Sequence, residues 1–150
     1  MPTTASAASP RKSPDVGKAV EKPLAACYII AIMEKIFITE FWTDAVIGTL
    51  PEERLRPQRL RLDLELRCDA SRAAVSDDLR DAVDYSAVER AVADAVEKSS
   101  FFLLEALAKA VGDVILSFPG GTECTVRIAK PGASVRAAIA YEAEFSRSGS

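Results

Sequence analysis

The sequence predicts an α+β domain in which two helices cover one face of an antiparallel sheet, in the order ββααββ. Three patterns support this fold class. Leucines alternate with charged residues along 58–68, two helical repeats follow along 86–118, and alternation resumes along 123–145. Alternation gives a strand one apolar face, and helices that follow it can cover that face.

The first two strand signals differ in strength. "KIFITEF" and "DAVIG" favour strand segments with a break near Trp42 to Asp44. "QRLRLDLELRC" is the clearer signal, because its leucines and Cys68 occupy every second position and arginines or acids fill the others. This period is typical of a strand that is buried on one face.

The first helix is predicted from "SAVERAVADAVEK". Ser86 and Glu89 have the spacing of a capping box, and Val88, Val92 and Val96 recur every fourth residue. The expected helix therefore begins at Ser86 and buries its valines.

The second helix is predicted from "SFFLLEALAKAVGDVILSF", and "PGG" ends it. One apolar stripe contains Leu103, Leu107, Val111, Val114 and Phe118. In a helix that covered the whole stretch, Phe101, Phe102 and Glu105 would lie away from this stripe. Two exposed phenylalanines beside a carboxylate predict a contact with a second copy of the chain.

The last two strands are predicted from "ECTVRIAK" and "SVRAAIAYEAEF", which flank a Pro-Gly turn. Lys130 stands immediately before this turn. Its position alone favours a solvated strand end, and a catalytic amine is the less common alternative.

Composition excludes several functions. The 150 residues have a net charge of −3 and no basic run, so nucleic acid is not an expected partner. Histidine is absent, which removes histidine-based catalysis and zinc sites built on histidine. Cys27, Cys68 and Cys124 form no metal-binding spacing, and we interpret them as buried thiols of a cytoplasmic protein.

The first 32 residues differ in composition from the rest. They are rich in Pro, Ser, Thr and Ala and lead into "LAACYIIAIM", which is shorter than the roughly 20 residues that span a bilayer. We therefore expect no membrane partner and favour a disordered extension over a targeting segment. The predicted divisions are 1–32 for the extension, 33–146 for the domain and 147–150 for a tail.

Four polar side chains could carry chemistry, and each has an ordinary interpretation by itself. Tyr85 suits a packing aromatic at a helix start, Glu53 lies in a polar loop, and Glu105 could pair with Lys109. Taken in order, "IGTLPEE", "QRLRLDLEL", "SDDLRDAVDYSAV", "FFLLEALA" and "VRIAKPGA" resemble the dihydroneopterin aldolase family from Met33 to about Phe145. The last two motifs are the most specific.

The resemblance implies a tunnelling fold, in which ββααββ subunits join their sheets into a ring. Such rings are commonly tetramers, which stack into octamers, with sites between neighbouring subunits. The implied reaction is retro-aldol cleavage of 7,8-dihydroneopterin, a pterin of folate biosynthesis, to 6-hydroxymethyl-7,8-dihydropterin and glycolaldehyde, with 2′-epimerisation as a side reaction. No metal and no cofactor are implied, because the dihydropterin's own imine accepts the electron pair.

Roles carry over to matching positions of this sequence. Lys130 would be the main acid and base, Tyr85 would assist proton transfer, and Glu53 would orient the diol. An ordinary lysine amine, with a pKa of about 10.4, is protonated at neutral pH, so a catalytic lysine needs burial or positive neighbours such as Arg127 or Arg136.

Pterin binding carries over in the same way. Glu105 would accept two hydrogen bonds from the pterin ring. Backbone groups of Leu104, Val83 and Asp84 would complete the pocket. The loop departs from many relatives at Thr49 and Leu50, which have neither the aromatic residue nor the histidine that those relatives carry after the glycine.

Two alternatives remain open at this point. One is the sister enzyme dihydroneopterin triphosphate 2′-epimerase, although "KPGA" looks like the aldolase type and no basic cluster suits a triphosphate. The other is a non-catalytic oligomeric pterin-binding protein, against which the retention of all four polar side chains argues.

Overall fold

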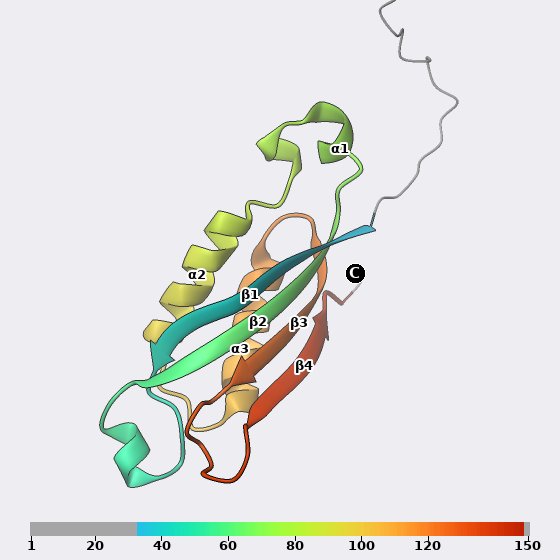
Figure 1. Ribbon diagram of the computed structural model, residues 1–150. Coiled ribbons are helices and arrows are strands. Elements are labelled where there is room, and N and C mark those ends of the chain that lie inside the picture. Colours follow the sequence, from blue (N-terminus) through green and yellow to red (C-terminus); the bar gives the residue numbers. More distant parts are fainter. Residues whose placement is uncertain (1–32, 149–150) are drawn as a thin grey trace, which may run out of the picture.

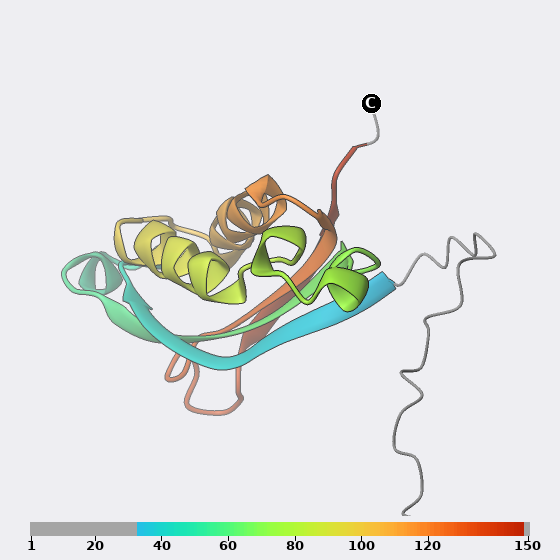
Figure 2. The ribbon, with the colours of Figure 1, turned by 90° about the horizontal axis from the view of Figure 1, so that it is seen from above.

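The computed structural model describes residues 33–148, and these form one antiparallel sheet with helices on one side. The strands are β1 (Met33–Ala45), β2 (Gln58–Asp69), β3 (Gly121–Ala129) and β4 (Ala140–Ser146), and they lie side by side in chain order (Figure 1). Between β2 and β3 the chain forms α2 (Tyr85–Glu97) and α3 (Leu104–Ser117), which lie over the same face of the sheet (Figure 2).

Three short helices complete the architecture. The 3₁₀ helix η1 (Pro51–Arg54) lies between β1 and β2, and α1 (Ala73–Ser76) and η2 (Leu79–Asp81) precede α2. The predicted order ββααββ is therefore confirmed. The predicted extension 1–32 lies outside the described residues.

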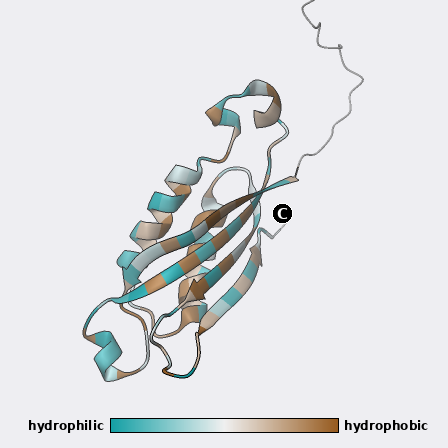
Figure 3. Ribbon diagram, viewed as in Figure 1, coloured by the Kyte–Doolittle hydropathy of each residue, from teal (hydrophilic) through white to brown (hydrophobic). Residues whose placement is uncertain are grey.

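The core forms between the helices and one face of β2 and β3. Every second residue of β2 from Leu60 to Cys68 is buried, and the alternating colours of β2 in Figure 3 follow this pattern. Cys124, Val126 and Ile128 of β3 continue the same layer. From the helices, Val88, Val92 and Val96 of α2 and Leu107, Val111 and Ile115 of α3 pack onto it.

The first strand is continuous, so the predicted break near Trp42 to Asp44 is wrong. The irregularity lies earlier, where Thr39 and Glu40 together oppose Asp63 between the pairs Ile38–Leu64 and Phe41–Leu62. Glu40 adopts φ of 55°, and its backbone N–H donates to Asp63 Oδ1 at 2.8 Å. A β-bulge absorbs the extra residue, and the strand continues to Ala45.

The first long helix begins one residue earlier than its predicted start. Asp84 is the N-cap, and its carboxylate accepts a hydrogen bond from Ala87 N–H at 2.9 Å. The predicted capping box of Ser86 and Glu89 is therefore wrong, because a carboxylate two residues upstream satisfies the first turn. The predicted burial of Val88, Val92 and Val96 is confirmed.

The second long helix begins later than expected, at Leu104. Phe101 and Phe102 precede it and are not helical, so the geometry that placed both on an exposed helix face is wrong. Phe101 is half-buried and packs against the core, whereas Phe102 is 60% exposed.

The face of the sheet opposite the helices carries ion pairs, beside the exposed Phe37 and Trp42 of β1. Lys35 pairs with Glu65 at 2.6 Å, Arg67 with Glu123 at 3.2 Å, and Arg127 with Glu142 at 3.9 Å. The alternation of the strands places these charged side chains on this face, because the residues next to them in sequence face the core.

The cysteines within residues 33–148 are Cys68 and Cys124, and both are free and buried as predicted. Burial raises the pKa of both thiols, that of Cys124 to about 11. Cys27 lies outside the described residues. Among the described helices, none combines the length and apolar character that crossing a membrane requires.

A substitution at the centre of the sheet tests this core. Leu62 is fully buried between the strands and helices, so Leu62→Ala should lower the free energy of unfolding by about 3 kcal/mol through lost burial and a residual cavity. Urea unfolding monitored by circular dichroism measures this loss. The control is Leu55→Ala, at a leucine that is 83% exposed, which should change stability by less than about 0.5 kcal/mol.

Candidate active site

The predicted catalytic residues Lys130 and Glu53 meet at one end of the sheet. In the register of β2 with β3, Ala129 opposes Arg61, so Lys130 lies just beyond β3 where β2 begins. The loop that leads into β2 contains η1 and Glu53. The strand ends thus bring together two side chains 77 residues apart in the sequence.

Lys130 is buried, not solvated. It is 8% exposed, and its Nζ lies 2.5 Å from Glu53 Oε1 and donates to the carbonyl of Ile47 at 3.2 Å. Its backbone N–H donates to Ile139 O at 3.0 Å, across the base of the loop that contains the Pro-Gly turn. The interpretation of Lys130 as an ordinary solvated strand end is therefore wrong.

The Glu53 carboxylate is held from two sides. Oε1 binds Lys130, and Oε2 accepts the backbone N–H of Leu50 at 3.1 Å. The hydrogen bond from Lys130 and then that from Leu50 lower the pKa of Glu53 below its ordinary value of 4.5. Near neutral pH this side chain is a carboxylate.

Gly48 makes room for this carboxylate. It adopts φ of +131°, and a Cβ at this position would lie 2.0 Å from Glu53 Oε2. A larger residue would therefore force Glu53 out of its contact with Lys130. Gln58 supports the same loop, since its side-chain amide donates to Ile47 O and to Glu53 O.

The predicted anchor Glu105 and its neighbour Leu104 lie at the same end of the molecule. They begin α3, three residues after Phe101, whose carbonyl accepts a hydrogen bond from Gly48 N–H at 3.4 Å. Glu105 is exposed. It does not form the ordinary helix ion pair with Lys109, because Lys109 binds Asp113 at 2.6 Å.

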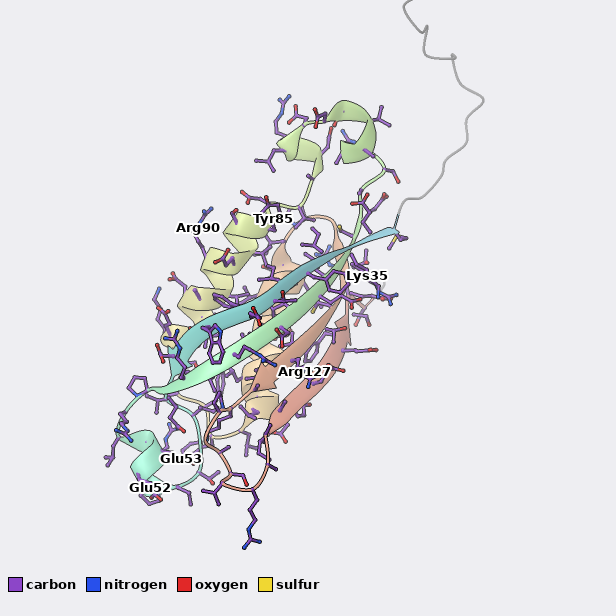
Figure 4. The ribbon with its side chains drawn as sticks, in the orientation of Figure 1. Lys35, Glu52, Glu53, Tyr85, Arg90 and Arg127 are labelled. Carbon is purple, nitrogen blue, oxygen red and sulfur yellow. The ribbon has the colours of Figure 1, made fainter. Side chains whose placement is uncertain are left out.

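Tyr85, Asp84 and Val83 lie at the opposite end. Figure 4 shows Tyr85 at the upper end of α2 and Glu53 at the lower end of the molecule. Tyr85 is 60% exposed beside an open depression of about 430 Å³, which residues 37–42 of β1 and Glu89 also line. Val83 belongs to the core and Asp84 caps α2. A single copy therefore separates the predicted site into two parts.

The charge environment of Lys130 differs from the expectation. Its charged neighbour is the Glu53 carboxylate, whereas Arg127 pairs with Glu142 on the face of the sheet opposite the helices and lies away from Glu53 in Figure 4. Within residues 33–148, no group of three or more His, Cys, Asp or Glu side chains is arranged to hold a metal ion.

Sequence reasoning missed the residues that frame the pair. Gly48, Arg54 and Gln58 hold the loop through backbone contacts, which residue spacing does not reveal. The glycine in "IGTLPEE" was the available signal, since loop glycines often adopt positive φ. Arg54 is one of several arginines in this stretch and carried no signal of its own.

The pKa of Glu53 provides a test of this pair. Lys130→Met removes the largest cause of the lowering, so the Glu53 pKa should rise toward its ordinary value. A carbon-13 NMR pH titration measures it, with Arg56→Met in the same loop as control. Because the folded carboxyl binds its proton less tightly, the pair stabilises the fold above about pH 4.5 and this contribution disappears as pH falls. An unchanged pKa in Lys130→Met would contradict the contact.

The chain is similar to known dihydroneopterin aldolases over nearly all of the described residues. The family model for dihydroneopterin aldolase matches residues 36–145. The dihydroneopterin aldolase of Escherichia coli strain K12 is 32% identical over 106 residues, which cover 71% of this chain and 87% of that protein. That of Methylorubrum extorquens is 35% identical over 111 residues, or 73% and 85% of the two chains.

A solved structure is similar over the same region. The Escherichia coli dihydroneopterin aldolase in complex with neopterin superposes with a TM-score of 0.71 and 30% identity, over 75% of this chain and 99% of that one. Its subunit has the tunnelling fold, and the element order and sheet described above agree with it. The chain belongs to the dihydroneopterin aldolase family.

Proposed function

We propose that this protein cleaves the side chain of 7,8-dihydroneopterin between C1′ and C2′, giving 6-hydroxymethyl-7,8-dihydropterin and glycolaldehyde in folate biosynthesis. The observation that carries the proposal is the buried contact of Lys130 with Glu53, at the end of the sheet where α3 presents Glu105. An amine and a carboxylate in contact are suited to proton transfer, and family membership supplies the substrate class.

The reaction requires proton transfers and an electron sink. The 2′-hydroxyl loses its proton and becomes the aldehyde of glycolaldehyde as the C1′–C2′ bond breaks. The released electron pair moves through C6 to N5 of the dihydropterin imine, N5 takes a proton, and an enol forms at C1′. Protonation at C1′ and loss of the N5 proton then give the hydroxymethyl product.

The residues divide these tasks. Lys130 exchanges a proton with the 2′-hydroxyl, directly or through water, and the Glu53 carboxylate 2.5 Å from Nζ orients the diol and exchanges protons with the amine. Tyr85 assists proton transfer at the side chain or the enol through its phenol. Glu105 binds the amino group and N3–H of the pterin ring, and backbone groups of Leu104, Val83 and Asp84 contact the ring.

We propose that two copies of the chain form each site. Lys130, Glu53 and Glu105 lie at one end of the subunit and Tyr85 at the other, so a neighbouring copy must supply the tyrosine. The outer strands β1 and β4 are edges of the sheet and offer backbone groups for pairing between copies. A ring of subunits, as a tetramer or stacked octamer, brings opposite ends together. The buried free thiols fit a cytoplasmic location.

A product assay tests the reaction. The purified protein is incubated with 7,8-dihydroneopterin, and glycolaldehyde and both pterin epimers are quantified. An aldolase releases glycolaldehyde, whereas an epimerase yields mainly the 2′-epimer and a binding protein yields neither. Absence of glycolaldehyde would exclude the proposed function.

The catalytic amine is tested in the same assay. Lys130→Ala should lower the rate of glycolaldehyde release by about a thousandfold or more, because it removes the acid and base of the reaction. Affinity for neopterin, measured by fluorescence, should stay within about threefold, because the ring is held elsewhere. An unchanged rate would remove Lys130 from the mechanism.

The anchor Glu105 should show the opposite behaviour. Glu105→Ala should weaken neopterin binding by about thirtyfold or more, since it leaves ring donors without a charged acceptor. Asp94→Ala serves as the matched control, because Asp94 is an exposed acid of α2 paired with Lys98 and should leave affinity unchanged. Equal affinities for the two variants would mean that the pterin binds elsewhere.

Mixed assemblies test whether two copies build each site. Tyr85→Ala and Lys130→Ala subunits should each be nearly inactive but, when co-expressed, should restore about a quarter of the sites. Glu53→Ala with Lys130→Ala is the control pair, since these side chains touch within one copy and mixing should restore none. Glycolaldehyde release is the measurement. Equal recovery from both pairs would contradict a shared site.

A further inference from the structure

Arg54 joins two segments that the proposed site needs at a fixed separation. Its guanidinium donates to the carbonyls of Phe101 at 2.8 Å and Ser100 at 2.7 Å, and to that of Gly48 at 3.4 Å. The same guanidinium lies over the ring of Phe102, with its carbon 4.3 Å from the ring centroid. One side chain thus holds the connection between α2 and α3 against the loop that contains Glu53.

Arg54 supplies side-chain hydrogen bonds to two backbone carbonyls of this connection. Ser100, Phe101 and Phe102 lie between the two helices and belong to neither. A planar guanidinium supplies several donors in a fixed fork and also stacks on an aromatic face, so it satisfies carbonyls that a single ammonium could not reach together.

Arg54 connects the loop that contains Glu53 to the segment that precedes Glu105. It is adjacent to Glu53 in η1, and it holds Phe101 four residues before Glu105. A shift of this connection would move the first turn of α3, with Leu104 and Glu105, relative to the Glu53–Lys130 pair. The ring-binding carboxylate and the reacting side chains are otherwise carried by separate elements.

We propose that Arg54 is a positioning residue that sets the distance between Glu105 and the Glu53–Lys130 pair. It holds the pterin ring in the place from which C1′ and C2′ reach the reacting groups, without touching the substrate itself. This inference rests on the proposed function, because it assigns Glu105 to the ring and the pair to the diol. Misplacement by about 1 Å can cost on the order of a hundredfold in rate, so such a contact is catalytically significant.

The test combines neopterin affinity with single-turnover cleavage of 7,8-dihydroneopterin. Arg54→Met keeps the length of the side chain and removes the donors, and Arg56→Met is the matched control at an exposed arginine two residues away. Arg54→Met should weaken neopterin binding about tenfold and slow cleavage at saturating substrate about tenfold, whereas Arg56→Met should change neither. Thermal unfolding establishes that both variants are folded at the assay temperature.

A double substitution separates positioning from general destabilisation. In the Glu105→Ala background, Arg54→Met should weaken neopterin binding by no more than about twofold, because the group that it positions is already absent. A loss of about tenfold in that background as well would show that Arg54 does not act through Glu105 and would overturn the inference.

Arg54→Lys provides a second variant if Arg54→Met does not fold. It retains the charge but not the fork, so neopterin binding should still weaken by about threefold or more. Affinity equal to that of the unsubstituted protein would contradict the proposal. Failure of the unsubstituted protein to release glycolaldehyde would refute the aldolase activity itself. Normal release, together with Arg54 variants whose affinity and cleavage rate are unchanged, would refute only the positioning role.

Discussion

The contact between Lys130 and Glu53 is the constraint on which one end of this molecule depends. A lysine that is 8% exposed requires a charged or polar partner, because an unpaired buried ammonium is very costly. The carboxylate of Glu53 and the carbonyl of Ile47 provide that partner. Gly48, Leu50 and Gln58 then hold the loop in the shape that brings Glu53 to the amine. The pair therefore connects the end of β3 to the loop between β1 and β2, which contains Glu53.

The antiparallel order of the strands explains why the predicted site residues Tyr85, Asp84 and Val83 lie far from this pair. β2 carries the chain from the Glu53 loop to the opposite end of the sheet, where α1, η2 and the start of α2 follow. Tyr85 begins α2 at that far end, and α2 then returns the chain toward Phe101 and Glu105. The proposed head-to-tail contact between copies would join these two ends, so a chain with its own hydrophobic core would complete its site only with a neighbour.

Sequence patterns predicted the elements that depend on burial and missed those that depend on single backbone contacts. The alternation of β2 and the valines of α2 were predicted because apolar burial has a period. The bulge at Glu40, the Asp84 cap and the late start of α3 have no period. The first two involve single hydrogen bonds, from Glu40 N–H to Asp63 and from Ala87 N–H to Asp84. Lys130 and Glu53 were identified by family resemblance, because their contact joins positions far apart in the chain.

The bulge in β1 limits where this strand can lose a residue. Even-numbered Ile36 and Ile38 face the helices before it, and odd-numbered Phe41 and Thr43 do so after it. Deleting one residue at 39–40 would straighten the strand and keep both sets facing inward, whereas a deletion elsewhere in β1 would invert part of it. The alternation of inward-facing residues thus confines a tolerated one-residue deletion within β1 to the bulge, beside the depression that Tyr85 lines.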